Sequence, residues 1–122
     1  MIRIVLAEVP RLLADIIKSE ISPRSDMAIV KEVHGGQNLD AVVTEADAHV
    51  VVASLSSPIV PRDYQRLLFG SRSVALVTIS ADGRDAQVYT RKVIREVTVD
   101  QIVQAIRAVA ATGVPGVSDK LM

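Results

Sequence analysis

The order of the apolar segments predicts an α/β protein with a five-stranded, mostly parallel sheet. Short aliphatic runs alternate with stretches of roughly ten residues whose apolar positions recur at helical spacing, which is the pattern of β-α-β units. The chain has 122 residues, of which 49% are hydrophobic, and this length suits one domain with an aliphatic core. Because there is no cysteine, disulfides, thiolate catalysis and cysteine-ligated metal sites are excluded.

The first half of the chain predicts two strand–helix pairs. Residues 2–7 are almost continuously aliphatic, as in a strand that is buried on both faces. Pro10 suits the first position of a helix that ends at Ser22-Pro23. Residues 27–33 predict a second strand, and Gly35-Gly36 leads to a second helix. The predicted apolar faces of the two helices are Leu13, Ile16, Ile17 and Ile21, and then Leu39, Val42, Val43 and Ala46.

The second half changes its pattern after the fourth strand. Residues 48–55 predict the third strand, Pro61 opens a helix that closes near Gly70, and residues 74–79 predict the fourth strand. Asp82-Gly83 is a pair favoured in tight hairpin turns, and residues 86–97 contain no helical stripe. We therefore predict that a helix is missing here and that a hairpin joins the fourth and fifth extended segments.

A capping-box pattern marks the last helix. Thr98 and Gln101 have the required spacing. The apolar face that follows comprises Ile102, Val103, Ile106, Val109 and Ala110. Residues 1–111 are expected to form one domain, and residues 112–122 a flexible tail or the start of a linker.

Five strands of this kind usually follow the flavodoxin-like order 2-1-3-4-5, in a doubly wound three-layer α/β/α arrangement. Ligands of such folds bind at the carboxyl ends of the strands. The residues that follow those strand ends are therefore the ones in which a site is expected.

Four segments carry a resemblance to a known family. They are residues 3–8 (RIVLAE), 28–33 (AIVKEV), 49–58 (HVVVASLSSP) and 98–109 (TVDQIVQAIRAV). They resemble the receiver domains of bacterial response regulators, the CheY-like family, and the resemblance covers residues 1–111. It implies a place in a two-component signal-transduction system. The second strand is similar to that of the subfamily with helix-turn-helix output domains.

This chain differs from the family at positions that phosphorylation requires. Ser54 stands where the family has its phosphoaccepting aspartate, and Glu8 alone stands where the family has an acidic pair for magnesium. The switch hydroxyl corresponds to Thr78 or Ser80, and the phosphate-contacting lysine to Arg95. The stretch between Ser80 and Arg95 is shorter than in most receivers. The resemblance thus implies a vestigial pocket of these five residues that is not phosphorylated.

Two hypotheses about this pocket stay open at the level of sequence. Glu8 and Arg95 form an ion pair across it, or Glu8 is simply solvated. Ser54 accepts a phosphoryl group in the manner of anti-anti-sigma-factor domains, or it belongs to a turn that leads to Pro58.

Motifs for catalysis, cofactors and metals are missing from the sequence. His34 and His49 have no second ligand at metal-binding spacing. Gly35-Gly36 lacks the third spaced glycine of a dinucleotide fingerprint, and there is no phosphate-binding loop. We therefore expect a protein that is not an enzyme and has neither a cofactor nor a metal.

The expected function is regulatory. We expect a cytoplasmic, non-phosphorylatable receiver-like domain that acts in signal transduction or transcriptional regulation through a protein partner, or as a homodimer formed through residues 86–97. No apolar run exceeds four residues, so no membrane association is expected. Nucleic acid would be bound only by an output domain outside this chain. The alternative is a sensor of a small anion or nucleotide at Glu8, Ser54, Ser80 and Arg95.

Overall fold

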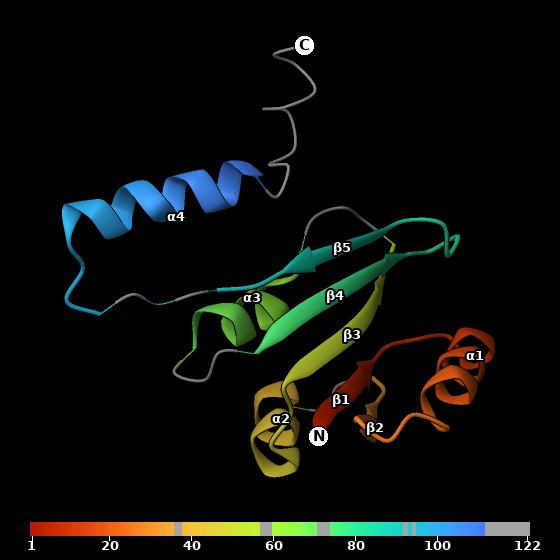
Figure 1. Cartoon of the computed structure of the whole chain (residues 1–122). Helices are drawn as coiled ribbons and strands as arrows, with labels where there is room; N and C mark the ends of the chain where they lie inside the picture. Colours follow the sequence, from red (N-terminus) through yellow and green to blue (C-terminus); the bar gives the residue numbers. More distant parts are fainter. Residues whose placement is uncertain (36–37, 57–59, 71–73, 92, 94, 112–122) are drawn as a thin grey trace. The chain divides into compact units, whose positions relative to one another are not determined.

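A computed structural model describes residues 1–35, 38–56, 60–70, 74–91, 93 and 95–111 (Figure 1). It divides into two compact units, Met1–Lys92 and Val93–Met122, and each is described on its own. The strands are β1 (Ile2–Ala7), β2 (Met27–Val33), β3 (Val50–Leu55), β4 (Ala75–Ser80) and β5 (Ala86–Tyr89). The helices are α1 (Arg11–Ile21), α2 (Leu39–Ala46), α3 (Arg62–Phe69) and α4 (Val99–Ala111). The expected tail, residues 112–122, lies outside the described residues.

The five strands form one sheet in the order β2-β1-β3-β4-β5. The first four strands are parallel, and β5 is antiparallel to β4. The predicted strand order and the predicted hairpin in place of a helix are therefore confirmed.

Strand β5 is shorter than the extended segment predicted over residues 86–97. It ends at Tyr89, which pairs with Leu76, only one residue from the start of β4. Only Ala75 of β4 lies beyond that pair, so the ladder could extend by no more than one residue. The prediction of an extended strand is wrong for the described residues after Tyr89. Instead, Arg91 Nη2 donates a hydrogen bond of 2.6 Å to the carbonyl oxygen of Gly70, just after α3.

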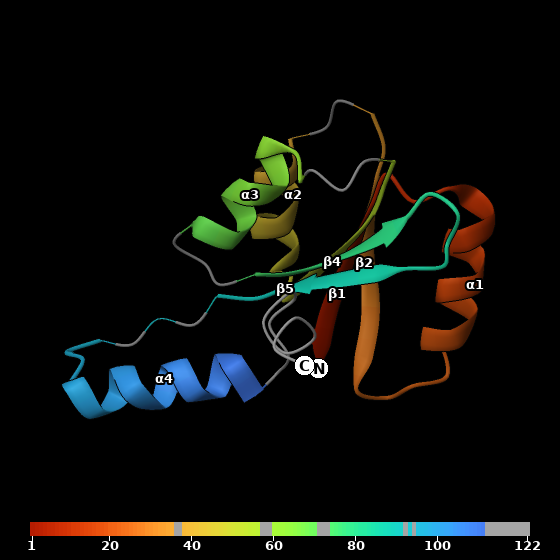
Figure 2. The ribbon, with the colours of Figure 1, turned by 90° about the horizontal axis from the view of Figure 1, so that it is seen from above.

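Helices lie on both faces of the sheet in the first unit (Figure 2). On one face, α1 packs Ala14 against a cluster that includes Ile4 and Leu6. On the other face, α2 and α3 pack Val43 and Leu67 against the larger cluster. The largest of the fully buried side chains, which come from the central strands, are Leu6, Leu76, Val5 and Val51. The sheet is thus covered on both faces at its centre, as the valine-rich strands require.

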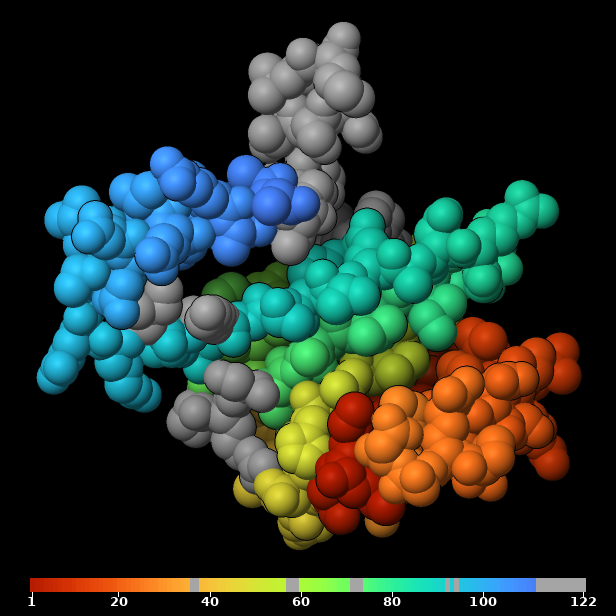
Figure 3. Space-filling view, in the orientation of Figure 1, coloured from red at the N-terminus to blue at the C-terminus, as the bar shows by residue number. Residues whose placement is uncertain are grey.

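Part of the sheet on the α1 side is not covered by the described residues of this unit. Val52 belongs to the α1 side and pairs with Val77, which in turn pairs with Val88. Strand alternation adds Ile79 to the same face. Val88 is 68% exposed, and Val77 and Ile79 are half-buried. We call these three residues the β4–β5 strip; β4 and β5 are the green and cyan surfaces beside α1 in Figure 3.

The second unit contains α4. The predicted capping box at its start is confirmed, because Gln101 N donates to Thr98 Oγ1 at 3.2 Å and Thr98 N donates to Gln101 Oε1 at 2.9 Å. No α4 residue is buried, although Ile102 and Ile106 lie on its apolar face. None of the described helices has the length and hydropathy that crossing a bilayer requires.

We expect side chains at the buried centre of the sheet to contribute more to the free energy of unfolding than exposed ones. Leu76→Ala empties a site that has no solvent exposure and should lower the free energy of unfolding by about 2–5 kcal/mol. Leu12→Ala makes the same change where the side chain is 75% exposed, and should lower it by less than about 0.5 kcal/mol. Urea denaturation followed by circular dichroism measures both, and equal losses would contradict the assigned core.

Candidate functional site

The carboxyl ends of β1, β3 and β4 lie at one edge of the sheet, where the sequence predicts a site. Two cavities open at this edge. The hairpin cavity has a volume of about 240 Å³ and lies between the ends of β3 and β4 and the β4–β5 turn. The carboxylate cavity has a volume of about 220 Å³ and lies beside the end of β1 and the start of α3. Of the predicted site residues, Thr78 and Ser80 line the hairpin cavity and Glu8 lines the carboxylate cavity, whereas Ser54 and Arg95 line neither.

The hairpin cavity has both apolar and polar walls, and five of its lining residues carry polar side chains. They are Ser56, Thr78, Ser80, Asp85 and Gln87. The hydroxyl of Ser80 is already engaged, because it donates to Asp82 Oδ1 at 2.6 Å and accepts from Asp85 N at 3.0 Å. Ser80 therefore serves to close the hairpin turn.

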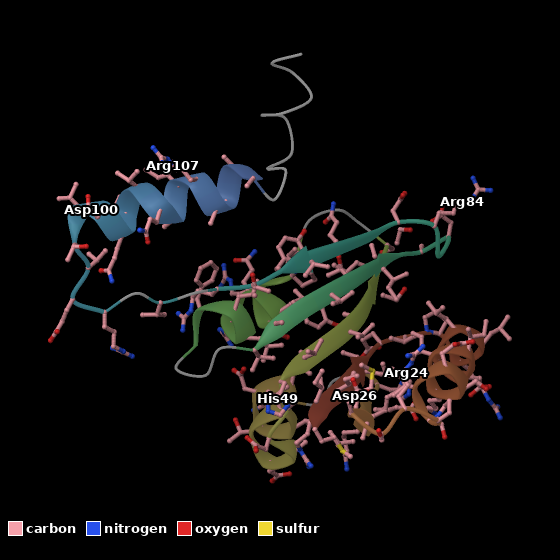
Figure 4. All side chains as sticks on the ribbon, in the orientation of Figure 1. Arg24, Asp26, His49, Arg84, Asp100 and Arg107 are labelled. Atoms are coloured by element: carbon pink, nitrogen blue, oxygen red, sulfur yellow. The ribbon has the colours of Figure 1, made fainter. Side chains whose placement is uncertain are left out.

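The same turn fixes the ionisation of Asp82. Hydrogen bonds from the Ser80 hydroxyl and the Arg84 backbone hold the pKa of Asp82 below its ordinary value. Gly83 occupies the left-handed region with φ of +73°, as the predicted Asp-Gly turn requires. Arg84 projects from the tip of the hairpin (Figure 4). The turn is thus stabilised by its own side chains.

Ser54 and Thr78 do not converge. Thr78 pairs with Ala53, which belongs to the core on the α2 and α3 side, and Thr78 is only 5% exposed. Ser54 pairs with Ile79 and is the next residue along β3, so its side chain lies on the opposite face of the sheet. The phosphoacceptor and switch positions implied by the resemblance therefore lie on different faces.

The charge of the hairpin cavity does not favour an anion. Its described lining includes the carboxylate of Asp85 and no lysine or arginine. Arg95, the basic group expected at this edge, belongs to the second unit. Moreover, β5 is antiparallel, so it ends beside Leu76, at the other end of β4 from Ser80. The hairpin cavity alone thus lacks the cation that an anion sensor needs.

The carboxylate cavity brings acidic and phenolic groups together. Glu8 follows β1 directly and adopts φ of 55°, in the left-handed region that is unusual for a side chain of this kind, while its N–H donates to Val33 O at 2.9 Å. Asp63 and Tyr64 enter from the first turn of α3. Tyr64 is only 7% exposed. The remaining walls are apolar and consist of Ala7, Val33, Leu39 and Pro61.

The environment of Tyr64 shifts the pKa of its phenol. Burial raises the pKa of its phenol, and the carboxylates of Glu8 and Asp63 raise it further. A phenolate there would lose hydration and face two negative charges. The phenol of Tyr64 is therefore held neutral, the form that can act as both a donor and an acceptor.

The described residues do not form a metal centre. Nowhere in the described ranges do three or more His, Cys, Asp or Glu side chains gather as a metal-binding group. His49 lies at the start of β3 (Figure 4), and its Nδ1 accepts a hydrogen bond of 2.9 Å from the backbone N of Arg3.

Sequence reasoning missed four site residues: Asp63, Tyr64, Asp85 and Gln87. Asp63 and Tyr64 follow Pro61 at the start of the helix after β3, and that helix starts at the carboxyl edge of a parallel sheet. Their position at the start of this helix could have identified them as candidate site residues. Asp85 and Gln87 had no comparable signal, because their place depends on the register of the hairpin.

The raised pKa of Tyr64 predicts a pH dependence of stability. Above the ordinary tyrosine pKa of about 10, the unfolded chain loses this proton while the folded chain retains it, so the free energy of unfolding falls as the pH rises. Tyr64→Phe should reduce that fall, with Tyr89→Phe as the control for loss of one phenol. Urea denaturation at about pH 8 and about pH 11 measures the fall in the free energy of unfolding between the two pH values. An unchanged pH slope in Tyr64→Phe would contradict the assignment.

No family model, no curated protein and no solved structure matches this chain. A proposal for its function therefore depends on the geometry and chemistry described above.

Proposed function

We propose that this chain is a receiver-like interaction domain with a flavodoxin-like, three-layer fold, which acts in cytoplasmic signal transduction or transcriptional regulation. It works by binding protein and not by catalysis or phosphoryl transfer. Support for the fold comes from the strand order β2-β1-β3-β4-β5 and from helices on both faces of the sheet. Support for the interaction role comes from the surfaces that the fold leaves apolar.

The observation that carries the proposal is the apolar face of α4. Ile102 is 46% exposed and Ile106 is 63% exposed, while no residue of the helix is buried. An isolated helix of thirteen residues is marginally stable in water, since most helical stability comes from packing of an apolar face. The helix therefore needs a surface against which to pack.

A second copy of the chain is the partner that these surfaces favour. Each copy carries an apolar helix, α4, and an apolar sheet surface, the β4–β5 strip, so two copies supply complementary surfaces to one another in a symmetric dimer. The formal net charge is zero, so two copies do not repel one another through excess charge. Strand β5 also ends the sheet, and its outer edge pairs with no strand of the described residues.

The site geometry supports a role without phosphorylation. Described residues 50–56, which form β3 and its exit, contain no carboxylate that could accept a phosphoryl group. Ser54 lines neither cavity, so it does not share one with Glu8, Asp63 or Asp85, the carboxylates that could act as a general base there. A hydroxyl without a base is a weak nucleophile.

The dimer predicts a specific response to one charged substitution. Ile106→Glu places a carboxylate in the apolar face of α4 and should shift the chain from dimer to monomer. Arg107→Glu changes the adjacent exposed residue (Figure 4) and serves as the control for a new acid on α4. Light scattering coupled to size-exclusion chromatography, over a range of concentrations, measures the mass.

Val88→Glu tests the other surface of the proposed dimer and should have the same effect. A wild-type chain that is monomeric at every concentration would contradict the proposal. So would a dimer that survives both Ile106→Glu and Val88→Glu.

Phosphorylation gives a separate prediction. Incubation with acetyl phosphate and magnesium should leave the intact mass unchanged, because β3 supplies no aspartate at its described end and Glu8 lacks the acidic partner of the family's pair. Mass spectrometry under neutral conditions preserves an acyl phosphate. Addition of one phosphoryl group at Ser54, Glu8 or any aspartate would contradict the proposal.

A further inference from the structure

Helix α1 has an apolar flank that borders the same face of the sheet as the β4–β5 strip. The helix is held on the sheet by Leu13, Ala14 and Ile17, which pack with the cluster of Ile4 and Leu6. Its two flanks therefore point across the strands in opposite directions, one toward the β2 edge of the sheet and one toward β3, β4 and β5.

Contacts with β2 identify the two flanks. Lys18 of α1 forms an ion pair with Glu32 of β2, and Ile21 lies beside Met27 of β2 around one hollow. This flank therefore faces the β2 edge of the sheet. Ile16 precedes Lys18 by two residues, which places it about 200° around the helix axis, on the opposite flank. Ile16 is 54% exposed, so the flank that faces the β4–β5 strip carries an uncovered apolar side chain.

The width of the uncovered sheet fits one helix beside α1. Packed helices lie about 8–10 Å apart, whereas neighbouring strands lie about 4.8 Å apart. Helix α1 packs on β1 and contacts β2. A helix packed beside it therefore lies about two strands further along the sheet, over β3 and β4. In that place it covers Val77 and Ile79, reaches Val88 and contacts Ile16.

Helix α4 has the length and the apolar face that this place requires. Its thirteen residues span about 20 Å, which is also about the span of the six residues of β4. Its two charged residues, Asp100 and Arg107, lie off the face formed by Ile102 and Ile106, because they are two residues and one residue away from it along the helix. The whole apolar face of α4 is therefore available for packing.

We infer that two copies of the chain exchange α4, so that α4 of each copy lies on the β4–β5 strip of the other, alongside α1. This inference rests on the proposed dimer and adds its arrangement and a contact residue, Ile16. Ile16 is the middle residue of α1, and Ile106 lies next to the middle of α4, so these two side chains face one another in either direction of α4. The exchange covers both strips and closes the assembly at two copies.

Disulfide cross-linking tests the contact, because the chain has no cysteine of its own. The full chain with Ile16→Cys and Ile106→Cys is oxidised with copper phenanthroline and separated on a non-reducing gel. Covalent dimers are expected, since a disulfide needs Cα atoms within about 7 Å of one another. Ser19→Cys with Ile106→Cys is the matched control, because Ser19 is exposed and lies two residues from Ile17, on the side of α1 away from the sheet. It should give about fivefold less covalent dimer.

A charged substitution tests the energetic role of the same residue. Ile16→Glu places a carboxylate in the apolar contact and should raise the dissociation constant of the dimer about tenfold. Ser19→Glu adds the same acid to the outer side of α1 and should leave the dissociation constant unchanged. Light scattering coupled to size-exclusion chromatography, over a range of concentrations, measures both. Circular dichroism and urea denaturation of each variant verify that it folds.

The outcomes separate this inference from the proposed dimer. A chain that is monomeric at every concentration overturns both. If the chain is a dimer, the exchange of α4 is overturned when the Ile16 and Ser19 cysteine variants give equal amounts of covalent dimer, or when Ile16→Glu leaves the dissociation constant unchanged. A disulfide that forms within a single chain, seen as a monomer without free thiols, overturns it as well, because α4 would then occupy the strip of its own copy.

Discussion

The tight turn between β4 and β5 is the constraint on which the rest of the structure depends. Ser80, Asp82 and Gly83 close it with local hydrogen bonds and one left-handed residue. A parallel strand would need a crossover of a dozen or more residues, usually through a helix, and this turn is far too short for that. Strand β5 is therefore antiparallel to β4, unlike the other strands of the sheet.

The reversal of β5 accounts for two features of the first unit, the exposed β4–β5 strip and the charge of the hairpin cavity. Among the described residues of the first unit, no helix links β4 to β5, and Val88 of the β4–β5 strip is 68% exposed. The residues after β5 leave from the end of the sheet opposite to Ser80, so the hairpin cavity has only Asp85 as a charged group in its described lining. The exposure of Val88 and the lack of a cation in the described lining of the hairpin cavity thus have one structural origin, the reversal of β5.

Local sequence patterns predicted most of the fold because they act over a few residues. Aliphatic runs identified the strands, Thr98 and Gln101 identified the start of α4, and Asp82-Gly83 identified the hairpin. The end of β5 was not predictable, because it depends on where β4 begins as its partner. The sequence also did not predict that Glu8 and Tyr64 line the same cavity. Glu8 follows β1, whereas Tyr64 lies in a helix more than fifty residues later.

The central claim is that α4 obtains its packing surface from a second copy of the chain. Amide hydrogen exchange of the full chain, measured at low and high protein concentration, tests this claim most directly. Exchange in β1, β3 and β4 should be slow at both concentrations, whereas protection of α4 should rise with concentration as copies associate. Strong protection of α4 that is independent of concentration would contradict the claim, because its partner surface would then lie within the same chain.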